Sequence, residues 1–427
     1  MPAAPIPAPA DQKRWIQLGL GLVAMMAISS PQYVWTLFVK PFQATTGASL
    51  AAVQITFSLL IVLQTFFSPV QGYLLDRFGP KLLIALGMVL TGLGWVSAAY
   101  VDTLIGLYAT YGLLCGVGTG IVYVGIVGLM VRWFPDRRGF AAGLVAAGYG
   151  MGAMLTTIPI DLIMGASGYR TALVVFGIVF GAVGFLAALG LRAPRPDEVP
   201  AAARLATSAA DTGPKDMLRT PLFWLMFAMM TMMSTGGPHG HVAVRRVRAR
   251  IRHRGRARAR PCGAAAGAYL RPSHERLHAP VLRLGVGPYR AREHDGDGVP
   301  ARSRGNRPAA RVSPERGRLR GPVGLVFFSW GEIFSLFPST LTDTFGTRDA
   351  TTNYGFLYMA QGVGSVLGGP VAALLRDATG SWLPVFGIVI AMDVATGLLA
   401  LFVLKPMRQA WLGIPQRRAV SVGLQAG

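Results

Sequence analysis

The chain has 427 residues, of which 52% are hydrophobic and only 14% are charged. Its mean hydropathy is +0.45, and its charged share is about half of that in a soluble globular protein. Composition therefore excludes an ordinary soluble domain and predicts a membrane protein with several spans. The net charge of +22 would suit a nucleic-acid-binding protein, but residues 239–320 alone contain 21 Arg and 5 acidic residues, so the charge is local.

The first half of the chain consists of six apolar runs, each about as long as the 20 residues that a helix needs to cross a bilayer. They cover roughly 15–38, 50–75, 82–101, 104–131, 139–163 and 170–192. Gly and Ala are frequent in them, as expected where helices pack closely in lipid. Because the polar leader with Lys13 and Arg14 runs straight into the first span, we expect no cleavable signal peptide.

A short polar stretch, QGYLLDRFGPK at Gln71–Lys81, separates the second and third runs and is predicted to be a turn. It resembles the signature loop of the major facilitator superfamily, which follows the pattern G-x-x-x-D-R-x-G-x-[RK]. The matching residues are Gly72, Asp76, Arg77, Gly79 and Lys81. The resemblance implies an all-α fold of two six-helix bundles around a site at the midplane, with alternating access by rocking of the two halves.

Positive charges lie before the first run and after the second, fourth and sixth, whereas the opposite connections hold few. The positive-inside rule therefore places both termini in the cytoplasm and the protein in the inner, cytoplasmic membrane. The predicted organisation is a six-helix bundle over 1–192, a cytoplasmic linker over 193–219, a second bundle over 220–405 and a cytoplasmic tail over 406–427.

The second bundle lacks two spans in the printed sequence. A seventh apolar run starts at Thr220 and stops near Gly237, and three later runs cover roughly 322–342, 351–374 and 382–404. The segment 238–321 stands where the eighth and ninth spans are expected. Charged residues at a helix centre cost about 2.5–3.5 kcal/mol each on insertion, so this segment cannot span a bilayer as printed, and we expect a chain made in this form not to transport.

Three interpretations of 238–321 are open: an arm that binds nucleic acid or anionic lipid, a disordered insertion, and a membrane sequence read in the wrong frame. The segment holds all six histidines of the chain and no lysine, a composition typical of GC-rich DNA read out of frame. Back-translation of RPSHERLHAPVLRLGVGPYRAREHDGDG with a shift of one base can give GWVSDRIGREN, a second copy of the signature loop. We therefore favour the frameshift, and resequencing of these codons tests it.

Three further strings narrow the resemblance. They are RWFPDRRG from Arg132, FFSWGEIFSLFPSTLTDTFG from Phe327 and NYGFLYMAQGVGSVLGGP from Asn353. Together they resemble the oxalate/formate antiporter-like branch, which moves small carboxylates. That resemblance implies a dianion held by two cations, an arginine on the eighth helix and a lysine on the eleventh. The arginine exists only in the shifted frame, and its position falls at about Ala279–Pro280 of the printed sequence. The lysine position holds the neutral Gln361, so a monoanionic acid is expected.

The predicted substrate-binding residues are polar or aromatic side chains inside apolar runs. They are Gln32, Tyr33, Trp35, Tyr123, Tyr149, Trp330, Glu332, Tyr358 and Gln361. The alternative for each aromatic residue is packing or anchoring at the membrane interface. Glu332 is a candidate proton carrier or arginine partner, and its alternative is a structural hydrogen bond.

A second set of residues is predicted to form a gate at the cytoplasmic surface, where charge pairs can hold the two halves in one state. It comprises Gly72, Asp76, Arg77, Gly79, Lys81, Arg132, Asp136, Arg137 and Arg138. The alternative is that these charges only set the topology.

No catalytic triad, P-loop or metal motif is present in the sequence, so we expect no enzyme, no cofactor and no metal. The predicted function is secondary active transport of a small organic anion, a mono- or dicarboxylate, by antiport or by proton-coupled symport. The alternative is a non-transporting membrane sensor on the same fold. The expected partners are this anion, protons in the symport case and the lipid bilayer, with no nucleic acid, and we expect a monomer.

Overall fold

The computed structural model describes residues 9–198, 211–235, 334–381 and 383–413. Within these ranges all regular elements are helices, which confirms the predicted all-α class. In the described part of the chain, four helices are long and apolar enough to cross a membrane, with Arg138–Gly190 counted as one helix, or up to six if each bent pair is one span. The segment 238–321, Trp330 and Glu332 lie outside the described residues.

The first two spans are each bent. α1 (Pro9–Ala27), α2 (Ser30–Tyr33) and α3 (Trp35–Thr46) form the first span, with a bend of 46° between α2 and α3. α4 (Leu50–Thr65) and α5 (Ser68–Phe78) form the second, with a bend of 44°. Pro31 and Pro69 lie in the first turns of α2 and α5, where a proline is tolerated but cannot continue the hydrogen bonds of the preceding helix.

The predicted turn at Gln71–Lys81 is mostly helical, contrary to expectation. α5 continues to Phe78, and α6 (Pro80–Ala98) begins two residues later, so that only Gly79 interrupts the helical chain. Gly79 has a φ of 87°, a conformation that side chains with a Cβ rarely adopt. A single glycine followed by a proline therefore reverses the chain, and no longer loop is needed.

The remaining spans of the first half follow directly. α7 (Leu104–Leu107), the π-helical turn η1 (Tyr108–Leu114) and α8 (Cys115–Trp133) form the fourth span. α9 (Arg138–Gly190) contains the fifth and sixth, because Gly168, with φ 83° and ψ 164°, interrupts its helical backbone. The connection to the second half includes the short helices η2 (Pro196–Glu198) and α11 (Pro214–Met217).

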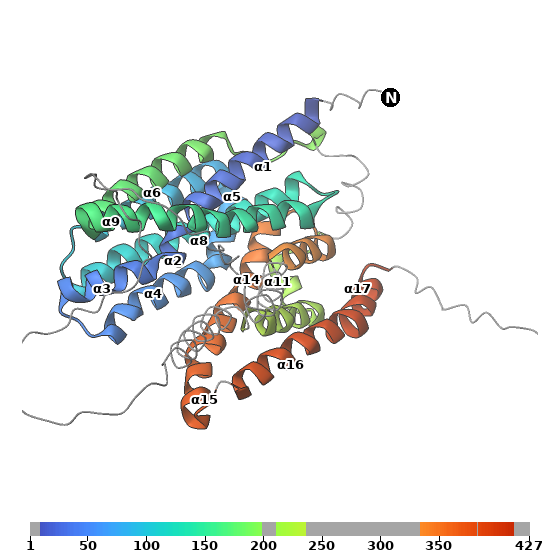
Figure 1. Cartoon of the computed structure of the whole chain (residues 1–427). Coiled ribbons are helices and arrows are strands. Elements are labelled where there is room, and N and C mark those ends of the chain that lie inside the picture. Colours follow the sequence, from blue (N-terminus) through green and yellow to red (C-terminus); the bar gives the residue numbers. More distant parts are fainter. Residues whose placement is uncertain (1–8, 199–210, 236–333, 382, 414–427) are drawn as a thin grey trace, which may run out of the picture. The chain divides into compact units, whose positions relative to one another are not determined.

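The second half begins with a helix over 221–235 and continues, in the described part, with a helix over 334–345. α14 (Ala350–Val366), η3 (Leu367–Val371) and α15 (Ala372–Thr379) form the next helical segment. The last consists of α16 (Leu383–Leu399), η4 (Ala400–Leu404) and α17 (Lys405–Trp411). α14 packs against α5, α8 and α4 of the first half, and this contact joins the two halves (Figure 1).

Burial is deepest along α8, where nearly every side chain is inaccessible. Its apolar cluster extends into α14 and the helix over 221–235, while a second cluster lies around Trp35, Trp95 and Tyr111. The last span is the opposite case, because Leu401 and Phe402 are 64% and 72% exposed. An apolar surface of this kind suits contact with lipid rather than water.

Candidate functional site

A buried hydrogen-bond network joins the two halves near the middle of their contact. Gln64 on α4 donates through Nε2 to the hydroxyl oxygens of Tyr149 on α9 and Tyr358 on α14, at 3.4 and 3.3 Å. The Tyr149 hydroxyl in turn donates to Oε1 of Gln32 on α2, at 2.6 Å. One amide from the first half thus contacts a tyrosine from each half.

Aromatic rings surround this network. The ring of Tyr123 on α8 stacks on that of Tyr358, with centroids 4.8 Å apart and an interplanar angle of 19°. Tyr123 and Tyr33 both meet Tyr149 edge-on, at 5.2 and 5.4 Å. Tyr354 extends the group, 5.7 Å from Tyr358. We call these five tyrosines, with Gln32 and Gln64, the tyrosine cluster.

Two buried amide oxygens in this region lack partners among the described residues. The Oε1 atoms of Gln64 and of Gln361 on α14 are inaccessible and have no hydrogen bond with a described residue. An unpaired buried polar group costs about 1–3 kcal/mol, so both atoms favour a ligand or a water that can pair with them. Gln361 lies three residues after Tyr358, and residues at this spacing lie on the same face of a helix. The cluster therefore offers hydroxyl and amide groups in apolar surroundings, which can orient a small polar ligand.

The structure brings together five of the predicted binding residues, namely Gln32, Tyr33, Tyr123, Tyr149 and Tyr358, and places Gln361 on the same face of α14 as Tyr358. Trp35 lies elsewhere, in the second apolar cluster. Its ring centroid is 4.8 Å from that of Tyr111, and its Nε1 donates to Oε1 of Gln54 at 2.6 Å. The contacts of Trp35 fit the alternative of packing.

Gln64 and Tyr354 were not among the predicted binding residues. Gln64 is a polar residue inside a long apolar run. Burying such a side chain in a membrane span costs free energy, so its presence there points to a functional role. This signal was present in the sequence. Tyr354 had no comparable signal, because its place in the cluster follows from how α14 packs against α8.

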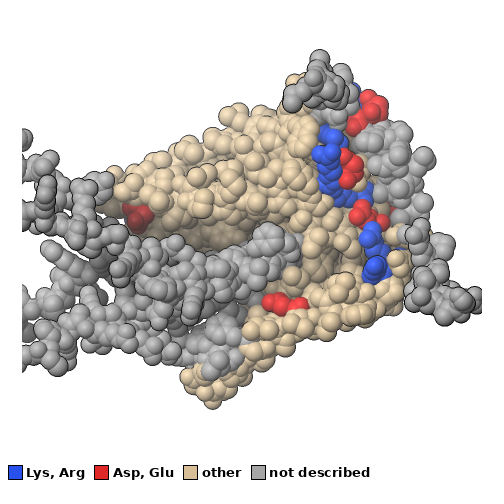
Figure 2. Space-filling model, turned by 45° about the vertical axis from the view of Figure 1, so that its right-hand side comes forward, with Lys and Arg blue, Asp and Glu red and all other residues tan. Residues whose placement is uncertain are grey.

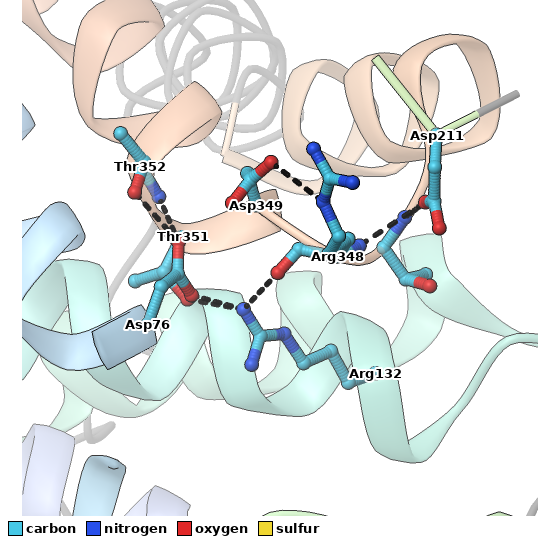
Figure 3. A network of polar contacts seen from close by, with 8 residues as sticks. Asp76, Arg132, Asp211, Arg348, Asp349, Thr351 and Thr352 are labelled. Atoms are coloured by element: carbon cyan, nitrogen blue, oxygen red, sulfur yellow. Dashed lines mark hydrogen bonds and ion pairs between the residues drawn. The ribbon is translucent and has the colours of Figure 1, made fainter. Parts of the chain in front are cut away.

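At one end of the α5–α14 contact, a charged network crosses between the halves (Figure 3). Asp76, near the end of α5, is ion-paired with Arg132 on α8. The same carboxylate accepts hydrogen bonds from the backbone nitrogen and the hydroxyl of Thr352, at 2.8 and 2.7 Å. Arg132 also donates to the hydroxyl of Thr351 at 3.2 Å and to the carbonyl oxygen of Arg348 at 3.4 Å.

A second ion pair between the halves joins Arg138, in the first turn of α9, to Asp343 in the helix over 334–345. The side chain of Arg138 is only 3% exposed, and its Nε donates to the carbonyl oxygen of Val131 at 3.3 Å. Asp343 is 39% exposed, so the pair is buried on one side only, and loss of the carboxylate would leave the Arg138 charge buried without this partner. Asp343 also lies 3.7 Å from Arg408 of α17.

Close backbone packing accompanies these charges. A Cβ on Gly72 would lie 2.5 Å from the carbonyl oxygen of Thr351, and one on Gly355 would lie 2.4 Å from that of Ser68. The Ser68 hydroxyl donates to the carbonyl oxygen of Gly355 at 2.6 Å. Small residues thus let α5 and α14 approach closely, and this end of the contact between the halves is closed.

The other predicted gate residues contact only their own half among the described residues, or none. Arg77 donates to the hydroxyl of Tyr73 at 2.8 Å. Asp136 pairs with Arg14 at 3.1 Å and with Arg137 at 3.6 Å. Lys81 is exposed, and Gly79 ends α5. Figure 2 shows Lys, Arg, Asp and Glu side chains gathered in a band at one end of the molecule, with few charges elsewhere on the visible face.

The chain is similar to known transporters over most of its length. The sequence pattern of the Major Facilitator Superfamily matches residues 18–242. The oxalate:formate antiporter of Oxalobacter formigenes is 32% identical over 430 residues, which cover 95% of this chain and 96% of that protein. Monocarboxylate transporter 11 of Homo sapiens is 31% identical over 189 residues, or 44% of this chain and 39% of that protein.

Solved structures agree on the fold. The human organic anion transporter MFSD10 superposes with a TM-score of 0.51 at 14% identity, covering 95% of this chain and all of that one. FucP in its outward conformation gives a TM-score of 0.51 at 15% identity, covering 93% of this chain and 99% of that one. At these identities the likeness supports the architecture alone.

Proposed function

Because the chain belongs to the major facilitator superfamily, whose members are multi-pass membrane transporters and not enzymes, we propose that it carries a small monoanionic carboxylate across the membrane by alternating access. The observation that carries this proposal is the pair of hydrogen bonds from Gln64 to Tyr149 and Tyr358. They place polar groups of both halves at one buried point, where a ligand would contact both halves at once.

The charge of the substrate is inferred from the polar groups of the cluster. The tyrosine cluster supplies hydroxyl and amide groups, and Gln361 is neutral where the antiporter-like branch has a lysine. A dianion that leaves water needs paired positive charge, whereas a monoanion can be held by a single cation together with hydrogen-bond donors. The names of two relatives, an oxalate:formate antiporter and a monocarboxylate transporter, are compatible with either charge class.

Alternating access requires a closure that can break. We propose that the Asp76–Thr352 hydrogen bonds and the Arg138–Asp343 pair form the cytoplasmic gate, with both termini on the same side of the inner membrane. Opening of this end would expose the tyrosine cluster to the cytoplasm. This closure combines polar contacts with close backbone packing, and such contacts can be broken and remade as the two halves move.

The test is exchange in proteoliposomes with two forms of the chain, one as printed and one with the reading frame restored across 238–321. We expect the restored form to exchange labelled formate or lactate in a saturable manner, and the printed form to be inactive. An imposed pH gradient separates antiport from proton symport.

Two outcomes would contradict the proposal. Oxalate exchange stronger than formate exchange would contradict the monoanion. Saturable binding, seen as quenching of tryptophan fluorescence, without any uptake would favour the membrane-sensor alternative. A frame-restored Tyr149→Phe and Tyr358→Phe pair serves as the site control, since it removes two hydroxyls and leaves the rings in place.

A further inference from the structure

A cavity of about 380 Å³ lies at the end of the last span, between α17 and the helix over 334–345. One part of its wall is apolar and consists of Ala400 and Leu404, at the end of the apolar span. This wall is continuous with the exposed apolar surface of η4, where Leu401 and Phe402 face outward. The cavity is therefore reached from the surface that suits lipid.

Beside this apolar part, the cavity is lined by the basic residues Lys405 and Arg408. Lys405 is exposed and makes no ion pair or side-chain hydrogen bond with any residue that the structure describes. Arg408 lies 3.7 Å from Asp343, but its Nε is inaccessible and has no hydrogen-bond partner there. Asp343 is itself paired with Arg138. The two cations that line the cavity thus have hydrogen-bonding capacity that the neighbouring carboxylate does not fill.

The depth of the cavity matches the boundary between hydrocarbon and headgroups. The apolar span ends where Lys405 and Arg408 begin, and Trp411 follows within one turn. The Trp411 Nε1 donates to the carbonyl oxygen of Thr344 at 3.3 Å, and its ring lies 5.8 Å from that of Phe345. Tryptophan and basic residues at the end of a span are typical of this interface.

We propose that this cavity binds one anionic phospholipid, with its phosphate between Lys405 and Arg408 and an acyl chain along Ala400 and Leu404. Charge complementarity selects the phosphate, because basic pockets at the cytoplasmic ends of spans attract anionic headgroups. The apolar wall selects a ligand that also carries a hydrocarbon chain, which a soluble phosphate lacks. The inference concerns a surface away from the tyrosine cluster and does not depend on the transported substrate.

The experiment is native mass spectrometry of the purified full chain in detergent, titrated with phosphatidylglycerol or phosphatidylcholine. We expect one phosphatidylglycerol to remain bound at low lipid excess and phosphatidylcholine to bind at least about tenfold more weakly. Lys405→Gln with Arg408→Gln should abolish this preference. The matched control is Lys215→Gln with Arg219→Gln, which removes the same two charges from the linker.

A second variant keeps the test valid if the double substitution unfolds the chain. Ala400→Phe fills the apolar part of the cavity without a change of charge, and it should lower phosphatidylglycerol retention while leaving the melting temperature in detergent nearly unchanged. Equal retention by the two double variants would overturn the proposal. So would displacement of the bound lipid by glycerol 3-phosphate at comparable concentration, because the site would then recognise a soluble phosphate.

Discussion

The carboxylate of Asp76 accepts hydrogen bonds from the backbone nitrogen and the hydroxyl of Thr352, which lies 276 residues later in the chain. Thr352 is the third residue of α14, and its N–H is one of the groups that a helix leaves unpaired in its first turn. A residue of the first half therefore caps a helix of the second. Arg132, which also belongs to the first half, forms an ion pair with the same carboxylate. This arrangement can exist only while this end is closed.

Asp76→Ala should open this end. Hydrogen bonds to a charged group contribute about 1.5–3 kcal/mol each, so the population of the open state should rise at least about tenfold. A cysteine introduced at Ala360, which is fully buried in α14, reports the opening through its rate of maleimide labelling in a background without native cysteines.

Asp102→Ala is the matched control, because its pair with Arg170 is exposed on both sides and joins the connection between the third and fourth spans to the start of the sixth. Exposed pairs contribute little, so labelling at residue 360 should not change. If Asp76→Ala left the labelling rate unchanged as well, Asp76 would serve topology alone and the gate would have to be assigned elsewhere.

Gly355→Ala should impair transport because α14 could no longer approach α5. The added Cβ would lie 2.4 Å from the carbonyl oxygen of Ser68, a backbone atom that cannot rotate away. Overpacking of this kind costs about 1–3 kcal/mol, and this cost destabilises the closed state, in which α5 and α14 are in contact. Initial rates of exchange in liposomes measure the loss. Gly150→Ala is the control, since nothing lies within 4 Å of its Cβ position, and equal rates for the two variants would refute the prediction.

Much of the fold could be predicted because membrane spans are encoded locally. The six apolar runs of the first half correspond to the helices between α1 and α9, and the family followed from motifs within single stretches. The bends were missed, although Pro69 lies at the second bend and Pro31 lies three residues before the first, at Val34. A span is predicted from apolar composition averaged over about 20 residues, and such an average does not reveal a helix break of one or two residues.

The bend at Val34 also explains why Trp35 lies apart from Gln32 and Tyr33. α2 ends at Tyr33 and α3 begins at Trp35 with a change of direction of 46°, so sequence neighbours face different clusters. Contacts such as Asp76–Thr352 could not be predicted, since no local pattern specifies how two halves of a chain meet. The predicted boundaries of the bundles, linker and tail stay predictions, as does the frameshift.

Acid should weaken the anchoring of the linker through Glu198. The guanidinium of Arg192, the backbone N–H of Arg195 and the ammonium of Lys13 lower the pKa of Glu198 from 4.5 to about 2. A lowered pKa means that the stabilisation is fully present above 4.5 and is lost as the pH falls toward 2.

The melting temperature of Glu198→Gln, measured in detergent across this range, should therefore lie below that of the parent chain at neutral pH and converge with it in acid. Asp197→Asn, at an exposed neighbour, controls for loss of a charge. A gap between Glu198→Gln and the parent that stayed constant down to the lowest pH would show that the carboxylate is not the group responsible.

Gln361→Lys should change the substrate class. Gln361 is only 8% exposed, and an unpaired ammonium there is costly unless a ligand supplies the opposite charge. A dianion supplies more negative charge than a monoanion does. In the frame-restored chain, the ratio of oxalate to formate exchange should rise at least about tenfold, which corresponds to about 1.4 kcal/mol of differential binding.

Gln361→Met is the control for this substitution, because it keeps the length of the side chain and removes its hydrogen-bonding groups without adding charge. It should slow exchange of both acids and leave their ratio nearly unchanged. A lysine variant with the parent's preference would mean that the substrate does not reach residue 361. The tyrosine cluster alone, through Tyr149, Tyr358 and Gln64, would then have to account for recognition of the substrate.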